Sequence, residues 1–245
     1  MLVTCRWGAI MADGAAQKAH NDLVLSFLSV RRAIGALGFF LPGALLAAAP
    51  FLEGGLRDSI SGFYYSPMRE VFVGTMCAQA VFLWSYEGFR PDRGEIVTDR
   101  GMARLAAVSA ALVALAPTTP PAGTVAECSA LQCVLGTGPA ALVHFVAAAL
   151  FFGALAVFCL VLFVRGSVDG PEKAASNRIY RICGWTILGC LLAIGMLEVT
   201  GAGASLAALH PVFWLESLAC LAFATSWTVK GDSLRPLVDA ARPAA

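Results

Sequence analysis

Residues 139–164 read PAALVHFVAAALFFGALAVFCLVLFV, a run without a single Asp, Glu, Lys or Arg. A helix needs roughly 20 mainly apolar residues to cross the hydrocarbon core of a bilayer. This run is long enough, and its leading proline suits the first turn of a helix, where a missing N–H is harmless. The stretch therefore predicts a transmembrane helix and makes the chain an integral membrane protein.

Apolar segments of similar length recur on both sides of this run. Hydrophobic residues make up 58% of the chain and charged residues only 13%, against about 25% charged in soluble domains. Three prolines from Pro117 onward predict that the third helix ends near Ala116. We expect an all-α fold with six transmembrane helices and no soluble module. The five further spans are predicted at 33–52, 71–86, 105–126, 182–197 and 211–229.

The distribution of positive charge orients these spans. Every Lys and Arg except Arg57 and Arg69 falls in the N-terminal segment, the second-to-third connection, the fourth-to-fifth connection or the tail. Positively charged loops stay in the cytoplasm. The sequence therefore predicts cytoplasmic termini, with an interfacial or cytoplasmic segment at 1–30, a membrane domain at 31–230 and a cytoplasmic tail at 231–245.

The composition also limits the partners. A net charge of +1 gives no basic field for nucleic acid, so the predicted partner is the lipid bilayer. A homo-oligomer or a larger membrane complex stays open. Cys128 and Cys133 share one predicted outer loop, where they form either a small disulfide loop or two free thiols.

Ionisable residues within the spans gather in the outer leaflet. His144 and Glu216 each follow a helix-starting proline by five residues, which places both about 7–8 Å below the outer helix ends. Glu198 precedes the outer end of the fifth helix, and Glu70 lies in the first turn of the second helix. Alanines share the face of His144, and small residues mark helix contacts in membranes. Glu70 shares a helical stripe with Gly74 and Ala78 in the same way. His144 and Glu70 are therefore both predicted to face the bundle.

These residues predict a polar pocket that opens to the outer side. Its expected core is His144, Glu198 and Glu216, and its expected mouth is Glu70, Arg69, Tyr64 and Tyr65. Carboxylates are expensive within a membrane and mark functional sites there. The inner half of the spans has few polar residues, which favours a pocket over a continuous pore.

Several functions fit such a pocket. The first hypothesis is binding of a small cation, a proton or a polar lipid head group, for transport or sensing. His144, Glu198 and Glu216 also have ligand types suited to a divalent metal. The chain has no HExxH or paired CxxC motif, so no cofactor is predicted while a divalent metal stays open. The alternatives are a membrane-embedded hydrolase that uses a metal or a His–Glu pair, and a structural subunit of a membrane complex.

Five stretches carry a resemblance to a known group of proteins. They are SISGFYYSPMREVFVG at 59–74, VHFVAAALFF at 143–152, NRIYRICG at 177–184, FWLESLA at 213–219 and SWTVKG at 226–231. Over most of residues 30–231 the chain resembles a group of uncharacterised bacterial six-span membrane proteins, with a more distant likeness to the Frag1/DRAM/Sfk1 six-span proteins. The resemblance implies the bacterial inner membrane, and it brings no activity with it.

Overall fold

The computed structural model describes residues 27–90, 94–121, 127–168 and 170–242. Within these ranges the chain forms helices and no strand, so the all-α prediction is confirmed for them. Most of the predicted N-terminal segment and the last residues of the predicted tail lie outside the described residues.

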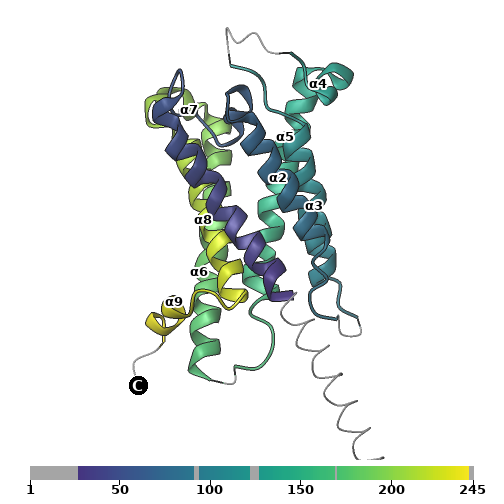
Figure 1. Cartoon of the computed structure of the whole chain (residues 1–245), viewed down its shortest axis with the longest axis vertical. Helices are drawn as coiled ribbons and strands as arrows, with labels where there is room; N and C mark the ends of the chain where they lie inside the picture. Colours follow the sequence, from purple (N-terminus) through teal and green to yellow (C-terminus); the bar gives the residue numbers. More distant parts are fainter. Residues whose placement is uncertain (1–26, 91–93, 122–126, 169, 243–245) are drawn as a thin grey trace, which may run out of the picture.

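Long helices lying side by side make up the bundle (Figure 1). In the described residues they are the N-terminal helix (Phe27–Phe51), α2 (Arg69–Trp84), α3 (Asp99–Leu115), α5 (Thr137–Val157), α6 (Pro171–Thr200) and α8 (Pro211–Lys230). A π-helical turn, η3 (Phe158–Leu162), continues α5.

Four of these helices are long and apolar enough to cross a membrane. They are the N-terminal helix, α5 with its π turn, α6 and α8. The other two, α2 and α3, have 16 and 17 residues, which gives each a length of about 24–26 Å. A membrane protein with several spans is therefore supported, and six spans remain a proposal.

The observed ends follow local chemistry. The third helix ends at Leu115, next to the predicted Ala116, because the prolines that follow cannot continue it. At its start, the Thr98 side chain accepts a hydrogen bond from the Gly101 amide as an N-cap. The predicted span 182–197 is only the apolar part of α6, since its first turns are polar and still helical.

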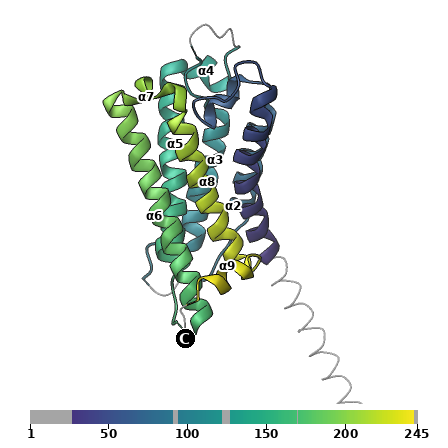
Figure 2. The same cartoon turned by 90° about the vertical axis from the view of Figure 1, so that its left-hand side faces the viewer.

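Short elements divide between the two ends of the bundle (Figures 1 and 2). One end, called the α7 end here, carries η2, α4, α7 and η4. The opposite end, called the α9 end, carries α9. Their bounds are η2 (Ser61–Tyr65), α4 (Ala130–Leu135), α7 (Ala202–Ser205), η4 (Ala207–Leu209) and α9 (Arg235–Ala240).

Small residues bring neighbouring helices close together. A Cβ atom at Gly38 would lie 2.8 Å from Cε1 of Phe223, so the N-terminal helix packs directly on α8. A Cβ atom at Gly184 would lie 2.5 Å from Cγ of Leu160, which brings α6 equally close to the π turn. Aromatic rings fill the core towards the α9 end, where Trp227 is fully buried and packs edge-on against Phe158.

Candidate functional site at the α7 end

The segment before α2 folds into the α7 end of the bundle. Ser61, Phe63 and Tyr64 are all buried, and the Phe63 ring lies 6.0 Å from the ring of Phe213 in α8. The Phe213 amide donates to the carbonyl oxygen of Asp58 at 2.9 Å. The sequence predicted that this segment forms the open mouth of a pocket. Its aromatic side chains instead pack inside the bundle, because burying them removes a large apolar area from water and lipid contact.

His144 joins this segment to α3. Its Nδ1 lies 2.7 Å from the carbonyl oxygen of Ala116, and its Nε2 lies 2.9 Å from Oγ of Ser61. A carbonyl oxygen can only accept, so Nδ1 carries the proton and the Ser61 hydroxyl donates to Nε2 in the neutral ring. His144 is 2% exposed and shares its buried face with Ala140 and Ala147. It therefore faces the bundle, as predicted from those alanines.

Glu216 reaches the same segment from α8. Its Oε2 atom accepts a hydrogen bond from the Ile60 amide, directly before Ser61 in the chain. Glu216 is partly buried, and no Lys, Arg or His among the described residues forms an ion pair with it. His144 and Glu216 are thus brought to consecutive residues of one loop, without a direct contact between them in the described structure.

A small cavity lies beside these two polar groups. Ser61 and Glu216 line it together with apolar side chains and Cys220, and its volume is about 40 Å³. Side chains from five helices line it, including Leu41, Phe72 and Val113. One water molecule takes up about 30 Å³ in the liquid. The cavity therefore fits a water molecule or a small ion, and a lipid head group is too large for it.

The remaining acidic residues of the predicted site are exposed. Glu198 lines a separate surface hollow of about 360 Å³ with Asp58 and Gly201. Glu70 and Arg69 are also exposed. Glu70 lies in the first turn of α2, where a carboxylate is favoured by the helix dipole.

The two tyrosines of the predicted mouth hold the loop in place. The Arg69 guanidinium donates to the Tyr64 hydroxyl and lies 4.2 Å from the centre of its ring. The Tyr65 hydroxyl donates to the Thr118 carbonyl oxygen and accepts from Nε2 of Gln132 at 2.8 Å. Burial raises the pKa of Tyr65 above its usual value, so this hydroxyl stays protonated and keeps donating.

The loop before α5 is closed by a disulfide. Cys128 and Cys133 are bonded to each other, which is the first of the two alternatives that the sequence left open. Between them, Ser129 and Gln132 form a capping box at the start of α4.

The structure does not assemble the predicted metal ligands. In the part of the chain that the structure describes, no three His, Cys, Asp or Glu side chains lie close enough to share a metal ion. Glu198 lies at the surface, whereas His144 uses both ring nitrogens for hydrogen bonds.

Sequence reasoning missed the groups that connect the site. Ser61, the Ile60 amide and the Ala116 carbonyl are ordinary residues in the sequence, and their role depends on how the loop folds back. Gln132 did have a sequence signal, because Ser129-x-x-Gln132 has the spacing of a capping box. Comparisons with protein-family models, with curated proteins and with solved structures give no match.

Proposed function

We propose that this chain is a six-span membrane protein with its termini in the cytoplasm, and that it binds a proton or a small monovalent cation at Glu216. In this proposal the α7 end faces outwards. Binding serves transport across the membrane or sensing of the outer solution.

One observation carries the proposal. Glu216 lines a cavity of about 40 Å³ with mostly apolar walls, and no described cationic side chain pairs with it. An unpaired carboxylate in such surroundings is strongly unfavourable. A bound proton or small cation removes that penalty, and the cavity volume limits the ligand to this size.

The surrounding groups are suited to this role. The Ile60 amide holds one carboxylate oxygen in place, and the Ser61 hydroxyl lines the same cavity. Ser61 donates to His144 in the neutral ring, so a chain of polar groups leads from the cavity to a second proton acceptor. These contacts support a proton over a larger ion.

Infrared difference spectroscopy of the full chain in liposomes tests this proposal. The carbonyl stretch of a protonated carboxylic acid should appear as the pH falls and should be lost in Glu216→Gln. The glutamine keeps an oxygen for the Ile60 amide, so the fold is retained. Glu198→Gln, which removes an exposed carboxylate at the same end, should keep the band.

Other ions and flux are tested with the same liposomes. If Na⁺ or K⁺ removes the band at fixed pH, the ligand is that cation. If a dye inside the vesicles reports proton entry that falls about tenfold or more in Glu216→Gln, binding serves transport. A wild-type chain without the band and without any cation effect would exclude the proposal.

The contact between Ser61 and His144 favours a second candidate, a hydrolase acting on acyl groups. A serine bonded to a histidine that a third group orients is the pattern of an activated nucleophile. Here the third group is the neutral Ala116 carbonyl, and the cavity is far below the roughly 300 Å³ at which ligand pockets begin. We therefore expect a fluorophosphonate probe to leave Ser61 unlabelled. Labelling that disappears in Ser61→Ala would establish the hydrolase instead.

A further inference from the structure

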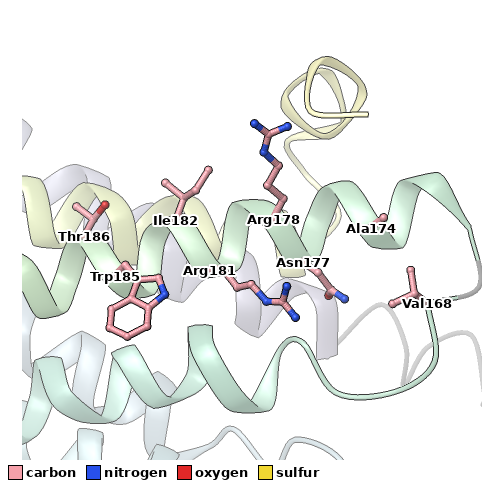
Figure 3. A pocket seen from close by; sticks show the side chains of 8 residues that line it. All are labelled: Val168, Ala174, Asn177, Arg178, Arg181, Ile182, Trp185 and Thr186. Atoms are coloured by element: carbon pink, nitrogen blue, oxygen red, sulfur yellow. The ribbon is translucent and has the colours of Figure 1, made fainter. Parts of the chain in front are cut away.

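A groove on the outside of α6 carries a second, unrelated set of polar groups (Figure 3). Its volume is about 690 Å³, within the roughly 300–1,000 Å³ of sites that hold small molecules. Arg178, Arg181 and Asn177 line it, with Ile182 and Trp185 one turn further along the helix. In Figure 3 the side chains of Arg181, Asn177 and Trp185 extend to one side of α6 and Arg178 to the other.

The polar groups of this groove lack partners among the described residues. No described acidic side chain forms an ion pair with Arg178 or Arg181, and both are exposed. Asn177 is 6% exposed, and its Oδ1 atom has no hydrogen-bond partner. Buried polar atoms are normally paired, so the groove offers two cationic donors and one free acceptor to a ligand.

An exposed apolar stripe continues from the groove along α6. Ile182, Trp185, Leu192, Met196 and Val199 are between 57% and 88% exposed and recur at helical spacing. Only 22% of the most apolar window of α6 is buried, the smallest share among the four candidate spans. The other described residues leave this face uncovered.

The position of the groove matches the head-group layer of a membrane. From Ile182 to Val199 the helix rises about 26 Å, close to the roughly 30 Å thickness of the hydrocarbon core. Arg178, Arg181 and Asn177 therefore lie just beyond the apolar zone, at the depth of lipid phosphates. Trp185 lies at the boundary, where tryptophan is enriched.

We infer that this groove binds a phospholipid with a net negative charge and a hydroxyl-bearing head group. Arg181, on the same side of α6 as Asn177 and Trp185, holds the phosphate as a charge-assisted donor, and Arg178 adds positive charge from the other side of the helix. Oδ1 of Asn177 accepts from a head-group hydroxyl. The acyl chains lie along the stripe from Ile182 to Val199. The continuous stripe favours a lipid over a soluble anion, and the unpaired arginines favour a negatively charged lipid over an apolar partner helix.

Native mass spectrometry of the full chain in detergent micelles tests this inference. Phosphatidylglycerol should bind more tightly than phosphatidylcholine of the same acyl chains. The double variant Arg178→Ala/Arg181→Ala should weaken phosphatidylglycerol binding roughly tenfold or more, and phosphatidylcholine binding, already weakened by its choline cation, should fall less. Arg181→Lys, which keeps the charge without the planar fork, should fall between the two.

A matched control removes two other arginines from the same end. Arg235 is the first residue of α9 and Arg242 follows its last residue, and both pair with acidic side chains. The double variant Arg235→Ala/Arg242→Ala should therefore bind phosphatidylglycerol as the wild type does. Equal affinity for the two lipids, equal losses in the two double variants, or displacement of the lipid by inorganic phosphate would each overturn the inference. So would efficient disulfide crosslinking of two copies of Trp185→Cys in phosphatidylcholine vesicles, since a second copy would then cover the groove.

Discussion

Replacing His144 by leucine should destabilise the chain by about 2–6 kcal/mol, because two buried polar groups lose their partner at roughly 1–3 kcal/mol each. The Ala116 carbonyl and the Ser61 hydroxyl both bond to this ring. Ala116 is fully buried and Ser61 is 7% exposed, so the bilayer and the outer solution give them little compensation. Unfolding in detergent, followed by tryptophan fluorescence, measures the change.

Two further variants separate the two bonds. Ser61→Ala removes one bond and should cost about 1–2 kcal/mol. His144→Asn keeps an amide donor near the position of Nδ1 and should retain the bond to the Ala116 carbonyl. Its loss in free energy of unfolding should therefore lie between the losses of the other two variants. A leucine variant as stable as the wild type would show that the histidine bonds add nothing to the fold.

The helices could be predicted because their signals are local. Uncharged runs marked the spans, and the prolines after Leu115 marked the end of α3. The start of α6 could not be found in this way. Its first turns contain Glu172, Lys173 and Arg178, which are compatible with a helix but end the apolar run. Hydropathy therefore located the membrane part of α6 and missed the part that extends beyond it.

The site was predicted in its helical residues and missed in its loop. His144 and Glu216 stood out because ionisable residues within a span need a reason to be there. Ser61 and the Ile60 amide gave no such signal, because their positions follow from the packing of Phe63 against Phe213. Glu70 was predicted to face the bundle because it shares a helical stripe with Gly74 and Ala78, but Glu70 and Gly74 are both exposed, so small residues here do not mark a helix contact within the described chain.

Arg31, at the α9 end, is another residue whose role in the fold the sequence did not reveal. Its charge served only to orient the chain, yet it is 5% exposed and lies among the core aromatics. Its guanidinium donates to the Tyr86 hydroxyl at 3.1 Å and to the Lys230 carbonyl oxygen at 3.3 Å. The ring of Phe27 lies 4.0 Å from its Cζ atom. Arg31 thus ties the N-terminal helix to the ends of α2 and α8.

Arg31→Ala should therefore lower the free energy of unfolding by about 3–6 kcal/mol or more, since each of the two bonds to this charged donor contributes roughly 1.5–3 kcal/mol and the cavity left behind adds to the loss. Arg31→Lys keeps the charge but cannot reach both acceptors with a planar fork, so about half of the loss should remain. The same unfolding measurement applies, and Trp227 reports on the region because its ring lies 4.9 Å from that of Tyr86.

The neighbouring arginine supplies the control. Arg32 is exposed, and among the described residues it makes a single bond, to the Gly231 carbonyl oxygen at 2.8 Å, so Arg32→Ala should cost about 1 kcal/mol. Both alanine variants remove one positive charge from the same segment and change the charge bias for membrane orientation equally. A difference between them therefore isolates the buried contacts of Arg31. Equal losses would instead show that the charge of this segment matters and that its contacts with Tyr86 and Lys230 do not.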